Sequence, residues 1–130
     1  MRSLLSATAV VLLLAGCSAN PYSFEYREIT DRSKIIQDPP PGPVTIVARR
    51  EPALGGSGAD NYFTFDGQRI VNLGAHDQYT FHSSAGQHVV GVVCDSPFGI
   101  VGNPELPLLA EPNKIYIFRV FTCQINAMTQ

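Results

Sequence analysis

Three histidines at equal intervals are the first candidates for metal chemistry in this chain. His76, His82 and His88 lie six residues apart, an even spacing that would place them on one side of a continuous strand. With Asp77 or Asp95 they would offer ligands suited to zinc or copper. Turn-forming residues at 74–77 and 83–86 interrupt any such strand. The favoured interpretation is therefore solvated histidines at strand ends, with no metal site and no cofactor.

The hydroxyl and carboxyl side chains predict no catalytic site. Four serines are candidate nucleophiles, and none lies in a G-x-S-x-G turn or beside an obvious His/Asp set: Ser57, Ser83, Ser84 and Ser96. The glycine-rich segment 51–60 lacks the lysine and helix start of a phosphate-binding loop. Four aspartates occupy turn positions, where aspartate commonly bonds nearby backbone: Asp60, Asp66, Asp77 and Asp95. We therefore expect a protein that is not an enzyme.

The first cysteine follows the only long apolar run of the chain. Arg2 precedes residues 4–15, which as a helix would span about 18 Å, too short for a hydrocarbon core of roughly 30 Å. This length is typical of a secretory signal peptide, and small residues follow it. Leu14-Ala15-Gly16-Cys17 resembles a bacterial lipobox, which implies removal of residues 1–16 and lipidation of Cys17. The alternative is an ordinary secreted protein in which this cysteine is there by chance.

The lipobox resemblance also predicts a location. Lipidation with N-acylation would place three acyl chains on Cys17, more than the two that stable anchoring needs. Ser18 follows, rather than aspartate, which in a Gram-negative host implies an outer-membrane anchor facing the periplasm. The membrane is then a partner through the N-terminal lipid.

The two remaining cysteines predict a disulfide. Cys94 and Cys123 each lie at the end of a predicted strand, and exported proteins meet an oxidising compartment. A bridge would close a loop of about thirty residues and contribute about 3 kcal/mol. Two buried free thiols or a metal pair are the alternatives, although no C-x-x-C or Cys-His spacing favours metal.

Length and charge limit the function classes. The chain has 130 residues and a formal net charge of −2, so we expect one domain and no nucleic-acid partner. Residues 17–43 read as a lipidated N-terminus and a tether that ends in a proline cluster. This tether is too apolar for a purely solvated linker, and alternation at Tyr22, Phe24 and Tyr26 predicts a short edge strand docked on the domain.

Residues 44–130 read as the folded domain, built from β-strands. Runs rich in β-branched and aromatic residues cover 44–50, 61–65, 68–73, 78–82, 87–94 and 114–123. Asp66-Gly67 between two of these runs is a strong hairpin signal. In the last run Ile115, Ile117, Arg119 and Phe121 would share one face, as in a central strand with two apolar faces. About seven strands with short turns predict an all-β fold, an antiparallel β-sandwich.

The strand motifs are similar to those of a known group of domains. Phe63-Thr64-Phe65-Asp66-Gly67 with the following strand resembles the "D-G" hairpin of small bacterial lipoprotein domains of unknown function. Segment 78–92 resembles a tyrosine-to-histidine segment of these domains, which also occurs in PEGA-type carrier domains. Segment 114–120 is similar to their closing strand. The resemblance covers roughly 44–122 and implies an Ig-like or prealbumin-like sandwich in the cell envelope. The resemblance implies no enzymatic activity and transfers no functional site. The chain departs from the family pattern at two places: Ala85 stands where proline is usual, and segment 95–113 is longer than the pattern leads us to expect.

Segment 95–113 contains four prolines and reads as an irregular connection with exposed apolar side chains. It either caps one end of the sandwich or forms a partner-binding loop, with these candidate residues: Phe98, Ile100, Leu106, Leu108 and Leu109. We expect a lipid-anchored envelope protein that acts as a non-catalytic binding or structural adaptor for another envelope protein. The alternative is a peptidoglycan- or carbohydrate-binding module that uses Tyr62, Tyr79 and Tyr116 for stacking.

Overall fold

A computed structural model describes residues 25–52, 59–121 and 123–128. Cys17, the signal-like segment and the first residues of the expected tether lie outside this range, as do Tyr22 and Phe24. The described residues form one short 3-10 helix, η1 (Arg32–Lys34), and ten strands: β1 (Arg27–Glu28), β2 (Val44–Arg50), β3 (Asp60–Phe65), β4 (Gln68–Asn72), β5 (Asp77–Ser83), β6 (Gly86–Ser96), β7 (Gly99–Gly102), β8 (Glu105–Ala110), β9 (Ile115–Phe121) and β10 (Gln124–Ala127). Among them no helix is long and apolar enough to cross a membrane.

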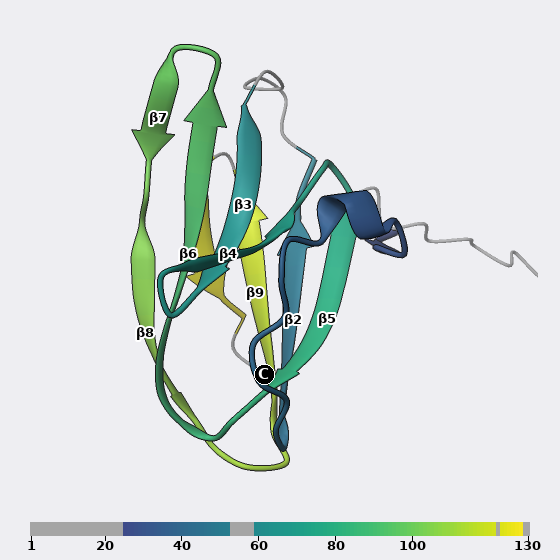
Figure 1. The fold of residues 1–130 in the computed structure, drawn as a ribbon, viewed down its shortest axis with the longest axis vertical. Helices are drawn as coiled ribbons and strands as arrows, with labels where there is room; N and C mark the ends of the chain where they lie inside the picture. The colour runs from purple at the N-terminus through teal and green to yellow at the C-terminus, as the bar shows by residue number, and fades with distance from the viewer. Residues whose placement is uncertain (1–24, 53–58, 122, 129–130) are drawn as a thin grey trace, which may run out of the picture.

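The strands form two sheets that pack face to face as a sandwich, so the all-β prediction is confirmed (Figure 1). The first sheet has the order β1-β5-β2-β9-β10. The second has the order β4-β3-β6-β7, and β8 also pairs with β6. Most pairs are antiparallel, but β1 pairs with β5 and β2 with β9 in parallel. About seven strands were expected and ten are described: six correspond to the predicted runs, and β1, β7, β8 and β10 are additional.

Alternating side chains from both sheets build the core. In β9 Phe118 and Val120 point inward and are buried, while the odd-numbered residues point outward, as the alternation predicts. Phe63 in the second sheet packs across the layer against Phe81 and Phe118 of the first, with ring centroids 6.1 and 6.0 Å apart. The Asp66-Gly67 turn is also as predicted, since both residues have positive φ values of 50° and 78°.

The residues before β2 close one side of the sandwich. The Ile29 N–H donates to the Gln78 carbonyl of the first sheet at 2.8 Å. The Ile36 N–H donates to the Ile70 carbonyl of the second sheet at 2.7 Å, next to a bridge between Ile35 and Val71. We call residues 27–38 the arm; it joins the β5 edge of one sheet to the β4 edge of the other. The arm therefore packs against the domain, and it contains a two-residue strand at Arg27–Glu28. The edge strand predicted from Tyr22, Phe24 and Tyr26 lies mostly outside the described residues.

A disulfide joins the two sheets on the opposite side. Cys94 in β6 is fully buried and bonds to Cys123 in the turn between β9 and β10, with a Cα–Cα distance of 5.2 Å. Cys123 has a φ of 60°, so this turn uses the left-handed region. The predicted pairing is confirmed, and it crosslinks the sheets where no arm covers them.

We predict that removing this disulfide destabilises the sandwich without changing its fold. In a Cys17→Ser background, Cys94→Ala/Cys123→Ala should lose about 3 kcal/mol of unfolding free energy, because the unfolded chain regains the freedom of the loop. Urea unfolding followed by circular dichroism measures the loss against Cys17→Ser alone. Two thiols titratable in the native, unreduced Cys17→Ser protein would contradict the bridge.

Candidate functional site

The structure divides the predicted partner-binding loop into two strands. Segment 95–113 is not an irregular connection, because β7 and β8 both pair with β6. Phe98 is fully exposed, while Ile100 and Leu109 are 64% and 68% exposed. Leu106 packs against the core and Leu108 is only 9% exposed. The five candidate residues are therefore not one surface: Leu106 and Leu108 face inward, and Phe98, Ile100 and Leu109 face solvent.

The position of one proline explains how β8 can be a strand. Pro107 faces Val89 of β6 in register. The Val89 N–H and carbonyl are both bonded to Asp66, at 2.9 and 2.7 Å, so the backbone of Val89 points away from β8. Pro107 thus occupies a non-hydrogen-bonded position, where its missing N–H would point to the free edge. The proline interrupts no ladder bond, and it limits pairing of a further strand at this edge.

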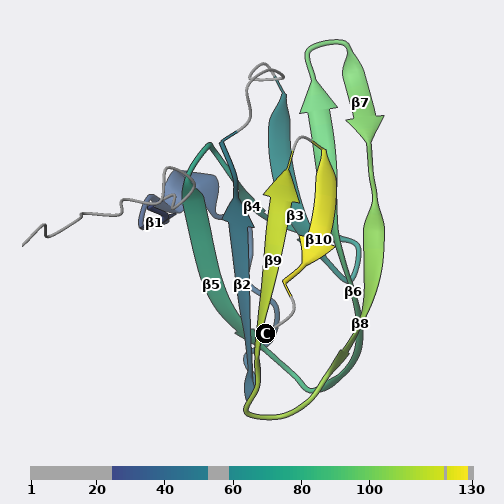
Figure 2. The same ribbon diagram turned by 180° about the vertical axis from the view of Figure 1, so that it is seen from behind.

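An apolar groove lies between β8 and the β9–β10 pair of the first sheet. Figure 2 shows these three strands on the side of the sandwich away from β1. Its volume is about 470 Å³. The lining is mostly apolar and includes Leu106, Leu108, Ile115, Tyr116, Ile117 and Met128. It also includes the charged Lys114, which is paired with Glu111. Ile115 is 51% exposed there. We call this feature the β8–β9 groove; it exists because β10 begins pairing at Phe118 and leaves the start of β9 uncovered.

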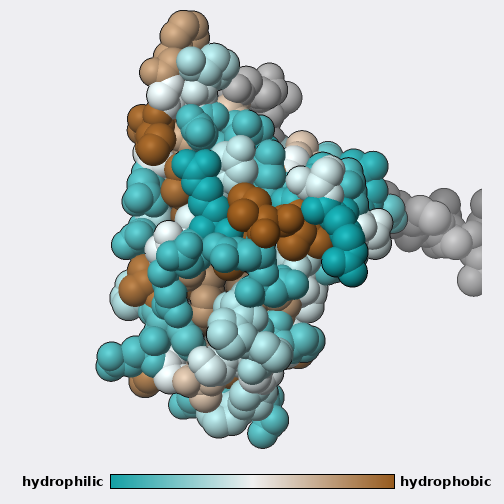
Figure 3. All heavy atoms as spheres, in the orientation of Figure 1, coloured by the Kyte–Doolittle hydropathy of each residue, from teal (hydrophilic) through white to brown (hydrophobic). Residues whose placement is uncertain are grey.

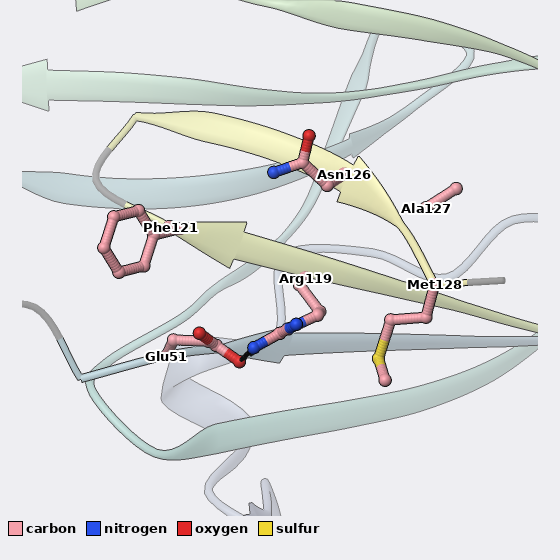
Figure 4. Close-up of a pocket in the computed structure, with 6 residues that line it drawn as sticks. All are labelled: Glu51, Arg119, Phe121, Asn126, Ala127 and Met128. Carbon is pink, nitrogen blue, oxygen red and sulfur yellow. Dashed lines mark hydrogen bonds and ion pairs between the residues drawn. The ribbon is translucent and has the colours of Figure 1, made fainter. Parts of the chain in front are cut away.

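A second hollow, of about 420 Å³, lies on the outer face of the first sheet. Figure 4 shows Glu51 and Arg119 pointing toward one another there, with Phe121 and Met128 beside them. Arg119 donates to Glu51 Oε1, which also accepts from the Tyr26 hydroxyl at 3.0 Å. The hydrogen bond to Glu51 raises the pKa of Arg119, and burial together with that carboxylate raises the pKa of Tyr26. These charges satisfy one another, so the hollow offers no free group for acid–base chemistry.

One side-chain cluster was not predicted from sequence. His88 Nδ1 lies 2.6 Å from Asp66 Oδ2, and the Ser84 hydroxyl lies 3.4 Å from His88 Nε2. The same Nε2 lies 2.8 Å from the Ser84 carbonyl oxygen, which can only accept a hydrogen bond. Nε2 therefore carries a hydrogen and cannot take the proton of the Ser84 hydroxyl. The arrangement resembles a Ser-His-Asp triad in composition but not in chemistry.

This cluster instead covers one end of the core. The His88 ring packs on Phe65 with centroids 4.5 Å apart, and only 10% of the His88 side chain is exposed. It joins the β3–β4 turn to the β5–β6 turn, which are adjacent in space but separated by about twenty residues. The expectation of solvated strand-end histidines is therefore wrong for His88. His82 is exposed, with Nδ1 3.3 Å from the Thr45 hydroxyl.

The remaining metal and stacking candidates do not converge. His76 lies in the turn before β5. Within the described ranges, no group of three or more His, Cys, Asp or Glu side chains could hold a metal ion. Of the three tyrosines proposed for sugar stacking, two have rings that are covered or buried, and the third has a bonded hydroxyl. The Tyr62 ring lies under the Arg69 guanidinium. Tyr79 is buried and its hydroxyl donates to Asp38, and both burial and this carboxylate raise the pKa of Tyr79. The Tyr116 hydroxyl donates to the Leu109 carbonyl and accepts from the Glu111 N–H.

We predict that His88 stabilises the fold and His82 does not. His88→Ala removes a ring held by two acceptors and exposes Phe65, so it should cost about 1–3 kcal/mol of unfolding free energy. His82→Ala, the matched control on the exposed face, should change that free energy by less than about 0.5 kcal/mol. Urea unfolding of both variants measures the difference. Equal losses for the two variants would contradict the role assigned to His88.

No family model, curated protein or solved structure matches this chain. The function proposed below therefore stands on the sequence motifs and on the geometry of the described residues.

Proposed function

We propose that this chain is a lipid-anchored cell-envelope adaptor, held by Cys17 and binding a protein partner without catalysis. The lipobox-like sequence ending at Cys17 supports the anchor. The Cys94–Cys123 disulfide is consistent with an exported protein, because such bonds persist in oxidising compartments. The resemblance to small bacterial lipoprotein domains points to the same location. In a Gram-negative host the anchor would lie in the outer membrane and the domain in the periplasm.

The single observation that carries the binding role is the β8–β9 groove. The arm covers the corresponding side at β4 and β5, whereas the described chain leaves this side with an uncovered apolar lining. Exposed apolar concavities of this size on soluble domains are typical of binding surfaces. A groove of about 470 Å³ accepts a few side chains of one extended segment rather than a broad surface. The proposed occupant is an apolar extended segment of another envelope protein.

Two neighbouring features determine how such a segment would bind. Pro107 removes a backbone donor from the free edge of β8, so a regular added strand loses one ladder bond there. The Leu109 carbonyl is partly used by the Tyr116 hydroxyl at 3.4 Å. Recognition would therefore depend more on side chains in the groove than on backbone pairing. The non-catalytic role is supported by the Ser84–His88 geometry, and the engaged tyrosines make glycan stacking the weaker alternative.

Anchoring increases the effect of even modest affinity. The lipid confines the domain to one leaflet, and the packed arm limits the distance between Cys17 and the groove. Confinement raises the effective concentration of a partner in the same envelope. An adaptor of this kind needs only a small groove, which is what the structure has.

We predict that the mature protein begins at Cys17 and carries lipid on it. Mass spectrometry of the purified N-terminal peptide should show loss of residues 1–16 and an added diacylglyceryl mass. Cys17→Ser should abolish both changes, because the thiol is the site of attachment. A mature chain with unmodified Cys17 would contradict the anchor.

We predict that a charge in the groove abolishes partner binding and leaves the fold intact. Ile115→Glu places a carboxylate against the apolar lining, whereas Ile36→Glu is a matched control, because Ile36 is 50% exposed and lies in the arm. Chemical crosslinking in intact envelopes followed by affinity purification should recover a partner with the wild type and Ile36→Glu but not with Ile115→Glu. Equal recovery with all three would contradict the groove as binding site.

A further inference from the structure

The β6–β7 hairpin ends in a tip that is apolar, uncharged and ordered by its own bonds. We call residues 96–101 the hairpin tip. The Phe98 N–H donates to the Ser96 hydroxyl at 3.2 Å, and that hydroxyl donates to the Gly99 carbonyl at 2.9 Å. Gly99 has a φ of 119°, a value that side chains other than glycine rarely adopt. The tip thus presents three apolar side chains from a fixed turn: Phe98, Ile100 and Val101.

The domain itself covers little of these side chains. Phe98 is fully exposed, and Ile100 and Val101 are about two-thirds exposed. Figure 3 shows hydrophobic atoms gathered over this projection at the top of the molecule. Residues 96–103 include no charged side chain. The nearest ionic group, Asp95, faces Arg69 at 3.9 Å below the tip, so the tip can leave water without burying a charge.

The hairpin tip lies at the same end of the sandwich as the start of the arm. In the first sheet β1 pairs with the first residues of β5. The start of β5 lies beside the end of β2, and the end of β2 lies beside the end of β9. Cys123 follows β9, and its disulfide reaches Cys94 in β6. The tip lies just beyond Cys94. Both views show the β6–β7 hairpin projecting at this end, while β1 lies on the other side of the sandwich and the chain after it runs to the opposite end, where β2 begins (Figures 1 and 2).

The length of chain before the arm limits where the membrane can be. Residues 18–25 cannot place Glu25 farther than about 28 Å from Cys17, even when fully extended. A lipid on Cys17 therefore keeps this end of the domain close to the bilayer. A rigid, uncharged hairpin with a phenylalanine and two aliphatic residues has the chemistry that favours the boundary between headgroups and acyl chains. A protein partner would need to reach this end through the narrow space beside the membrane.

We propose that the hairpin tip inserts into the surface of the bilayer that holds the Cys17 lipid. The proposal rests on the lipidation proposed above and adds a second, non-covalent contact with the membrane. Two contacts at one end orient the sandwich with its long axis away from the bilayer. The β8–β9 groove, which extends to the start of β9 at the other end, then faces the compartment where partners are. Because the tip has no charge, insertion should depend little on salt or on anionic lipid.

The sequence allows a direct test, because the chain has no tryptophan. Phe98→Trp introduces a single reporter at a fully exposed position, where the larger ring disturbs no packing. Ile115→Trp is the control, since Ile115 begins β9 opposite Thr45 at the far end of the sandwich. Both lipidated proteins are purified and reconstituted into vesicles of zwitterionic phospholipid, with and without brominated acyl chains, at low and high salt.

We expect a blue-shifted emission for the Phe98→Trp protein that brominated lipid quenches strongly at both salt concentrations. The emission of the Ile115→Trp protein should not be quenched by brominated lipid at either salt concentration, because this position lies at the far end of the sandwich. Unquenched emission from Phe98→Trp in vesicle-bound, lipidated protein would overturn the membrane contact and leave the anchor in place, pointing to a protein partner for the tip. Quenching that disappears at high salt would also overturn the proposal that the hairpin tip inserts through apolar contacts. An unmodified Cys17 would overturn both the anchor and this proposal.

Discussion

The structure depends on keeping water out of the space between two sheets. The contact of Phe63 with Phe81 and Phe118 joins the inner faces, but a sandwich of open sheets also has two sides through which water reaches the core. On one side the arm bridges β5 and β4 with backbone bonds at Ile29 and Ile36. On the other side the disulfide joins the sheets at one end, and at the other end the described residues leave the β8–β9 groove uncovered. One side of the sandwich is therefore closed by the arm, whereas the groove on the other side is available for the proposed binding.

The same asymmetry links the anchor to the proposed binding role. The arm continues the segment that begins at Cys17, so the residues that would connect the domain to the proposed anchor also complete its core. The groove lies on the side away from the arm, where neither attachment nor arm packing obstructs it. Closure by the arm and the proposed binding in the groove thus use different surfaces, so a change in the groove need not disturb the closed side.

Local patterns in the sequence predicted the strands and turns whose conformation is set by their own and neighbouring residues. Strands such as β2 and β9 follow from alternating β-branched and aromatic residues, and the β3–β4 turn follows from Asp66-Gly67. Prolines concealed β7 and β8, because whether Pro107 breaks a strand depends on which side of the ladder its nitrogen faces. The His88 cluster was missed since Asp66 is brought to it from a distant turn. The arm depends on bonds to β4 and β5, far along the chain, that its own sequence does not specify.

The central claim is that one side of the sandwich is closed by the arm and the other is open to a partner. Amide hydrogen exchange of the lipidated protein, compared between its native membranes and the purified state, tests this most directly. We expect slow exchange of residues 27–38 in both states, and exchange of β8 and the start of β9 that slows only in native membranes. Fast exchange of the arm in the purified protein, or groove amides that exchange equally in both states, would contradict it.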